Sequence, residues 1–223
     1  VYAETCPQYM LLSAEDLGID DSDPMHGARC ICSPPPRDKA NQKFIWSGLA
    51  SGLFTIVSSD HAPFNVAGPD GKAVAGEDAS FDRIPNGVPG VETRLPLLMS
   101  EGVLGGRFDV HRFVELTSTS PARLYGLYPR KGTIAVGSDA DLVVWDIRPD
   151  GETFPLRQEM LHSACDYTPY EGLALRAWPA VTLSRGRTVW REGRFSAEPG
   201  SGAFLPCARP LAPRAGEPYA RWV

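Results

Sequence analysis

Leu53 to Ser58, in "GLFTIVSSDHAPFN", is a mostly apolar run that predicts a buried β-strand. Before it, apolar residues recur at helical spacing, so we expect a helix over 38–49, with Gly52 after its end. The opening residues Val1 to Thr5 indicate another short strand, which Pro7 ends. Strand, helix and strand in this order are typical of an α/β fold.

The next part of the chain alternates between loop and helix patterns. Residues 65–90 are rich in Gly, Asp and Pro, and a loop of that length is usually functional or mobile. Helical patterns follow over 90–102 and 109–116. A third helix is expected over Thr117 to Leu127, with Ser120 as its N-cap and a proline in its first turn. The sequence therefore predicts a helical segment that ends near residue 127.

After Leu127 the pattern changes to short β-branched runs. Residues 131–146 predict two strands, and residues 180–195 predict a hairpin around the turn "SRGR". Residues 198–223 are rich in Pro, Gly and Arg with little apolar material, so we expect a tail that is disordered or lies on a neighbouring subunit. The second half of the chain is therefore predicted to be mostly β.

Composition narrows the function classes without naming one. The 223 residues are 43% hydrophobic and 22% charged, which are ordinary globular values. A formal net charge of −5 argues against nucleic acid as a partner, and no apolar run is long enough to predict a membrane span. The five cysteines form an odd, scattered set, which predicts reduced thiols in a cytoplasmic compartment.

Asp60 is the main candidate for chemistry because it directly follows the predicted Leu53–Ser58 strand. In parallel α/β barrels, catalytic groups stand at the carboxyl ends of strands. A carboxylate there can bind a metal with one oxygen and take a proton from water with the other. An ordinary Asx turn ended by Pro63 explains the same residues. His61 is a weaker candidate, since histidines beside turns are often satisfied polar groups.

Two further segments could contact a ligand. In "CSPPPR", the stiff proline run after Ser33 leaves backbone groups unpaired. In "IPNGVPG", two turn signals around Asn86 leave backbone N–H and C=O groups available for a planar amide. Both segments also fit plain connecting loops. Cys30 and Cys32 are too closely spaced for a structural zinc site.

Taken together, the segments resemble one family, the dihydropyrimidinase and D-hydantoinase group of cyclic amidohydrolases. The resemblance covers most of residues 1–193 in the family's order. The matching segments are "VYAETCPQYMLL", "CSPPPR", "SSDHAPFN", "IPNGVPGVETRLPLL", "FVELTSTSPARLYGLYPRKGTIAVGSDADLVVWD" and "HSACDYTPYEG". "SDHAP" alone would also suit an allantoinase or a dihydroorotase, so that related activity stays open.

The resemblance implies an enzyme that hydrolyses a C–N bond of a cyclic amide, in a hydantoin or a dihydropyrimidine. Water is activated between two metal ions, usually zinc. By match, Asp60 binds a metal and carries the proton to the leaving nitrogen. Ser33 and Asn86, by match, hold the amide edge of the substrate, largely through backbone atoms.

The resemblance also implies the fold: the C-terminal part of a (β/α)8 TIM barrel, followed by part of a small β-sandwich. We expect barrel over 1–127, sandwich with a connecting segment over 128–195, and a tail over 196–223 for oligomer contacts. The family's other metal ligands, a His-x-His pair, a carboxylated lysine and two more histidines, precede the "ETCPQY" segment. The chain is therefore expected to be a piece of a longer enzyme and inactive alone.

The implied partners are a small cyclic amide or ureide substrate and further copies of the chain, as a dimer or tetramer, with neither nucleic acid nor membrane. Two other readings remain. One is a non-catalytic relative that acts as a scaffold, which has no chemical need for Asp60. The other is an independent short binding module, for which two open barrel strands are physically awkward.

Overall fold

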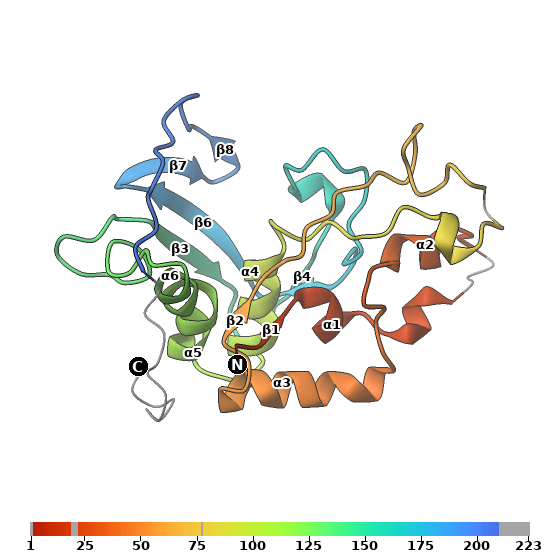
Figure 1. Ribbon diagram of the computed structural model, residues 1–223, viewed down its shortest axis with the longest axis horizontal. Helices are drawn as coiled ribbons and strands as arrows, with labels where there is room; N and C mark the ends of the chain where they lie inside the picture. Colours follow the sequence, from red (N-terminus) through yellow and green to blue (C-terminus); the bar gives the residue numbers. More distant parts are fainter. Residues whose placement is uncertain (1, 19–21, 77, 210–223) are drawn as a thin grey trace. The chain divides into compact units, whose positions relative to one another are not determined.

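The computed structural model describes residues 2–18, 22–76 and 78–209 (Figure 1). The chain divides into two compact units. The first comprises Val1–Phe113 and Ile147–Ala177, and the second comprises Val114–Asp146 and Trp178–Val223. Each unit therefore has its own internal packing, and the first one contains every residue predicted to take part in chemistry.

A small βαβ arrangement organises the first unit. Strands β1 (Glu4–Thr5) and β2 (Ile56–Val57) pair in parallel, and helix α3 (Gln42–Ser51) connects them. Figure 1 shows α3 below the two strands. The α/β prediction is confirmed for this part, and both strands are shorter than predicted. In the described part of the chain each strand has one neighbour, so ladder hydrogen bonds form only where the two strands overlap.

Helix α3 forms for the reasons that its sequence indicates. A short 3-10 turn, η2 (Lys39–Asn41), precedes it, and its apolar positions Trp46 and Leu49 are buried. Gly52 follows its last residue in the left-handed conformation, with φ 87°. Glycine adopts that conformation at no steric cost, so the predicted end of the helix is confirmed.

The rest of the first unit consists of short elements. The strands β4 and β5 pair antiparallel, and the helical pattern predicted over 90–102 is confirmed as α4 and η4, the latter a π-helical turn. The bounds are α1 (Pro7–Leu11), η1 (Ala14–Leu17), α2 (His26–Cys30), η3 (Phe81–Arg83), α4 (Arg94–Leu97), η4 (Leu98–Val103), α5 (Val110–Val114), β4 (Phe154–Pro155), η6 (Gln158–Met160) and β5 (Ala174–Leu175).

The predicted N-cap at Ser120 is wrong. The π-helical segment η5 (Glu115–Thr119) runs directly into α6 (Ser120–Leu124), and the backbone of Ser120 is helical, with φ −63° and ψ −45°. Proline in a helix lacks the N–H of the normal hydrogen bond and its ring collides with the preceding turn. The wider π-helical turn immediately before Pro121 gives the ring room, so the helix continues where the sequence suggested a new start.

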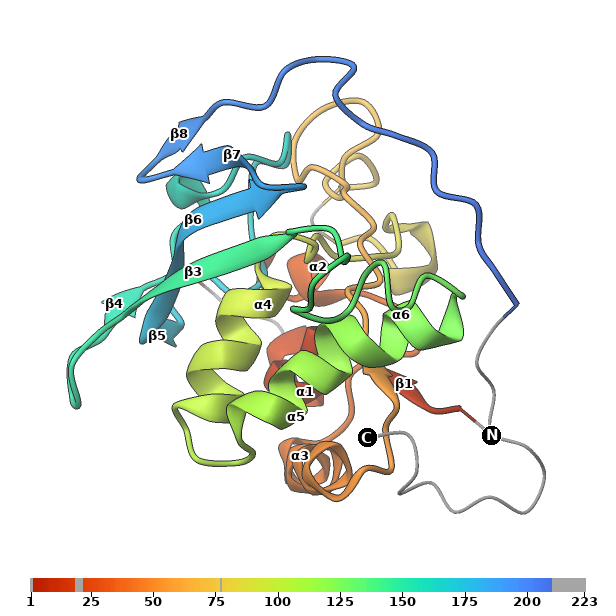
Figure 2. The same cartoon turned by 90° about the vertical axis from the view of Figure 1, so that its left-hand side faces the viewer.

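The second unit contains a sheet with the strand order β3-β6-β7-β8 (Figure 2). The predicted hairpin is confirmed as the β6–β7 pair, whose two-residue turn has positive φ at Arg185 (49°) and Gly186 (77°). A second tight turn leads into the unpredicted β8. The bounds are β3 (Leu142–Ile147), β6 (Ala177–Ser184), β7 (Arg187–Arg191) and β8 (Arg194–Phe195).

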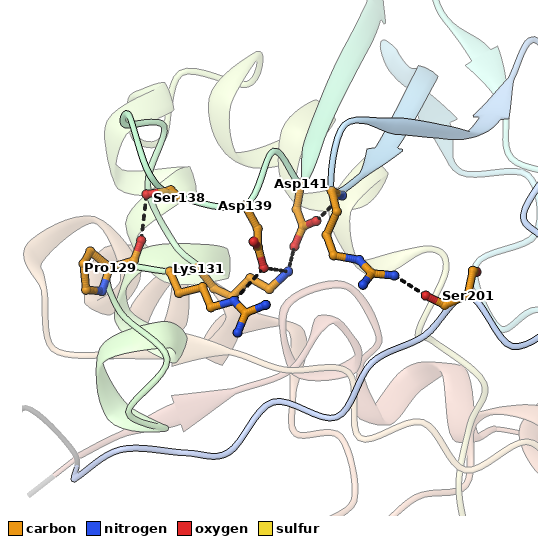
Figure 3. A network of polar contacts seen from close by, with 8 residues as sticks. Pro129, Lys131, Ser138, Asp139, Asp141 and Ser201 are labelled. Atoms are coloured by element: carbon orange, nitrogen blue, oxygen red, sulfur yellow. Dashed lines mark hydrogen bonds and ion pairs between the residues drawn. The ribbon is translucent and has the colours of Figure 1, made fainter.

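Of the two strands predicted over 131–146, the first is wrong, because residues 131–141 form turns. The Lys131 ammonium contacts Asp139 at 3.0 Å and also pairs with Asp141, so one cation closes the segment on itself (Figure 3). Ile134, at 86% exposure, has no strand beside it. The β-branched pattern of this segment therefore lies in a loop closed by ion pairs and not in a strand.

The predicted tail is described only as far as residue 209. Residues 196–209 contain neither helix nor strand, and the remainder of the tail, like Val1, lies outside the described residues. Within 2–18, 22–76 and 78–209, no helix has the length and apolar character needed to cross a bilayer.

Arg112 ties α5 to the corner between α3 and β2. Its Nε donates to the carbonyl of Leu49 at 2.7 Å, and its Nη2 donates to the carbonyl of Phe54 at 2.6 Å. Both carbonyls lie where the chain leaves the helix and enters the strand. A charged donor therefore satisfies backbone groups that neither element can pair.

We expect Arg112→Met to lower the free energy of unfolding by about 2–3 kcal/mol, because it leaves two carbonyls without their charged donor. Urea denaturation of the purified protein measures the change. The matched control is Lys43→Met on the exposed side of α3, which should change stability by less than about 0.5 kcal/mol. Equal effects of the two substitutions would contradict the structural role of Arg112.

Candidate functional site

Asp60 lies three residues beyond β2, where the chain leaves the parallel pair. The pairing continues one step past the strand, since the Ser58 N–H donates to the Thr5 carbonyl at 3.1 Å. Asp60 then takes a left-handed backbone conformation, with φ 46°. Asp and Asn are among the few residues besides glycine that accept this conformation. The turn leaves the Asp60 side chain exposed, and within the described residues its carboxylate makes no hydrogen bond.

The residues after Asp60 are held against the segment 85–91. His61 and Val88 form a parallel bridge, and the Ala62 N–H donates to the Val88 carbonyl at 3.0 Å. The Nδ1 atom of His61 accepts hydrogen bonds from the N–H groups of Gly90 (3.0 Å) and Val91 (3.3 Å). An Nδ1 that accepts hydrogen bonds carries no proton. The two contacts therefore fix the orientation of the His61 ring and give it a structural role in this arrangement.

Gly87 permits the close approach of these two segments. A Cβ built on Gly87 would lie 2.3 Å from the Cβ of Ala62, and the backbone there has φ 139°. Neither the distance nor the dihedral angle suits a residue with a side chain. The turn that carries Asn86 can therefore lie beside the turn that carries Asp60.

Ser33 and Asn86 are brought together by the same contacts. The Asn86 Nδ2 donates to the Ser33 Oγ at 2.6 Å, and the Gly87 N–H donates to the Ile31 carbonyl at 3.0 Å. Both side chains are exposed. The segments 31–33, 58–62 and 85–91 therefore converge, and they carry the three residues that the sequence singled out.

The thiols beside Asp60 are protonated. Burial, and then the negative charge of Asp60, raise the pKa of Cys32 to about 11. Burial also raises the pKa of Cys6, although a 3.2 Å contact with the Ser58 hydroxyl works in the opposite direction. Neutral thiols are poor nucleophiles and poor metal ligands, which argues against a reactive role for these cysteines.

Sequence reasoning missed two cations beside the site, Arg94, which is partly buried, and Lys72, which is completely buried. The Arg94 Nη1 donates to the carbonyl of Val57 at 2.6 Å and so supports the end of β2. Burial lowers the pKa of Arg94. Lys72 is completely buried within the predicted loop over 65–90. Nothing in their sequence neighbourhoods distinguishes these two from solvated surface cations, because their acceptors are backbone carbonyls of distant segments.

A metal ion would find one protein ligand in this part of the chain. Among the described residues, no group of three or more His, Cys, Asp or Glu is placed to hold a metal. Asp60 offers an exposed carboxylate oxygen, which suits zinc. The Nδ1 atom of His61 already accepts two main-chain hydrogen bonds. Asp60 thus fits as one ligand of a centre that needs others.

The chain is similar to several known proteins. The family model described as "Amidohydrolase family" matches residues 37–189. The D-phenylhydantoinase of Escherichia coli O1:K1 is 42% identical over 205 residues, which are 92% of this chain and 42% of that protein. The solved dihydropyrimidinase of Brevibacillus agri NCHU1002 is 41% identical, with a TM-score of 0.86 over 96% of this chain and 44% of its own.

A more distant solved relative, the L-hydantoinase (dihydropyrimidinase) of Arthrobacter aurescens, is 31% identical, with a TM-score of 0.77. The match includes 89% of this chain and 41% of that protein. The chain thus spans less than half the length of these relatives. Sequence identity, family model and structural similarity lead to one conclusion: the chain belongs to the amidohydrolase family, in its dihydropyrimidinase and D-hydantoinase group.

Proposed function

We propose that the chain is the C-terminal portion of a metal-dependent enzyme that hydrolyses a ring C–N bond of a hydantoin or a dihydropyrimidine. One observation carries the proposal. The exposed Asp60 carboxylate stands on a left-handed turn that is hydrogen-bonded to the segment of Asn86, which in turn contacts Ser33. A scaffold without chemistry has no need for an uncompensated carboxylate at the end of a strand.

In the proposed reaction, Asp60 has two tasks. One of its oxygens would help to hold a zinc ion, and the other would accept a proton from the attacking water. When bound, zinc would polarise the substrate carbonyl and lower the pKa of the attacking water. Asp60 then passes the proton to the ring nitrogen as the C–N bond breaks, so that the nitrogen leaves as a neutral amide. The exposure of Asp60 in this part of the chain leaves room for both partners.

Ser33 and Asn86 orient the ring. Their side chains are joined at 2.6 Å, so the two turns keep a fixed relation and can present backbone N–H and C=O groups to the amide edge of the substrate. A cyclic amide offers alternating donors and acceptors in one plane, which such a pair of turns can match. Binding in this way would hold the reacting carbonyl beside Asp60.

We further propose that residues 1–127 belong to a (β/α)8 barrel, residues 128–195 to a β-sandwich, and residues 196–223 to oligomer contacts of a dimer or tetramer. Exposed apolar side chains such as Val136 and Phe204 support the proposal that this surface contacts another part of the protein or another subunit. The remaining zinc ligands would come from residues that precede the chain. The five cysteines are all free, which supports a reducing compartment such as the cytoplasm.

Asp60→Asn in the complete, metal-loaded polypeptide should lower kcat for ring opening by at least about a thousandfold, because asparagine cannot carry the proton. Asparagine accepts the left-handed backbone, so stability should change little. Zinc content, measured by atomic emission, should also fall. Asp70→Asn, at an exposed position in the following loop, is the control and should retain activity. Full activity of the Asp60 variant would refute the assignment.

The 223-residue chain alone, supplied with zinc, should not open 5-phenylhydantoin or dihydrouracil, because a catalytic zinc typically takes about three protein ligands. Chromatographic detection of the ring-opened ureido acid measures the reaction. Turnover by the isolated chain would show that its own residues complete the site.

A further inference from the structure

Lys72 has the most unusual environment of any charged residue described in the first unit. Its side chain is completely buried. Because lysine is almost never fully buried unless it is paired, its hydrogen-bond partners matter. Its backbone N–H donates to the Asn65 carbonyl at 2.8 Å, which fixes the loop around it. The long loop predicted to be functional or mobile is therefore anchored by a buried cation.

The Lys72 ammonium joins the two segments that carry Ser33 and Asn86. Its Nζ donates to the Pro85 carbonyl at 2.8 Å and to the Ile31 carbonyl at 3.4 Å. Pro85 directly precedes Asn86, and Ile31 lies two residues before Ser33. One cation therefore adds to the Gly87–Ile31 main-chain hydrogen bond and the Asn86–Ser33 side-chain contact in fixing the separation of the two turns.

We propose that Lys72 is a positioning residue that holds the Ser33 and Asn86 segments in register and thereby determines the affinity for the amide edge of the substrate. The proposal rests on the proposed function of these segments. Lys72 touches neither the substrate nor Asp60 in this scheme, so its removal should change binding more than turnover. A charge-assisted donor is suited to this task because its hydrogen bonds are stronger than those of a neutral group.

The surroundings of Lys72 give the proposal a pH signature. Burial lowers the pKa of Lys72 to about 8, and the groups that face it are the thiols of Cys30 and Cys32. Burial raises the pKa of these thiols to about 12 and about 11, so both stay neutral while Lys72 titrates. Above about pH 8 the ammonium becomes a neutral amine, a weaker donor to the two carbonyls.

The test measures kcat and KM of the complete, metal-loaded polypeptide with dihydrouracil, from about pH 7 to about pH 9.5. The wild-type KM should rise about threefold or more as the pH passes the pKa of Lys72, about 8. Lys72→Met should raise KM about tenfold at neutral pH, leave kcat within about threefold, and remove the inflection. Lys43→Met, which removes an exposed lysine, should behave as wild type. A wild-type KM without inflection, or an unchanged KM in the Lys72 variant, would overturn the proposal.

A second readout does not depend on activity. Lys72 has a folded-state pKa of about 8, below the ordinary lysine pKa of 10.5, so between these values the unfolded chain binds a proton that the folded protein lacks. The free energy of unfolding should therefore rise with pH in this window, relative to Lys72→Met. If no substrate is hydrolysed but this difference is found, the proposed function fails and the burial of Lys72 stands. If the two curves run parallel, the positioning role fails.

Discussion

The structure around the site depends on hydrogen bonds between three loops and not on an extensive sheet. The two strands beneath it pair over two residues each, so the segments 31–33, 58–62 and 85–91 hold one another. The Val88 carbonyl and the Ile31 carbonyl are the central acceptors of this arrangement. Every proposed role in chemistry follows from these main-chain contacts, because they set which side chains emerge side by side.

Cationic side chains, partly or completely buried, satisfy backbone carbonyls that the elements cannot pair by themselves. Arg94, Arg112 and Lys72 each donate to carbonyls at the end of a strand, the end of a helix or a turn. Hydrogen bonds from charged donors are worth about 1.5–3 kcal/mol each, roughly twice a neutral one, which offsets part of the cost of burying the charge. Irregular segments can thus be as firmly fixed as regular elements.

The sequence predicted those features that are determined locally. The end of α3 at Gly52 and the "SRGR" hairpin follow from backbone preferences of the residues involved, and both are found. The N-cap prediction at Ser120 is wrong because the π-helical segment before it continues directly into α6, and residues near Ser120 alone do not reveal this. The strand predicted at Lys131 is absent, and the ion pairs that close the loop there join residues eight and ten positions apart, which a local pattern does not reveal. The convergence of the site segments depends on similar distant contacts, so only family resemblance anticipated it.

The left-handed backbone at Asp60 has a consequence for how this site can evolve. Glutamate is the nearest chemical alternative to aspartate, yet it is poorly tolerated at positive φ and its longer side chain would displace the carboxylate. Asparagine, the easiest replacement sterically, cannot serve as a base. The backbone conformation and the proposed proton transfer therefore both favour aspartate at position 60. Replacing it with a different metal-binding residue would first require a change in the turn.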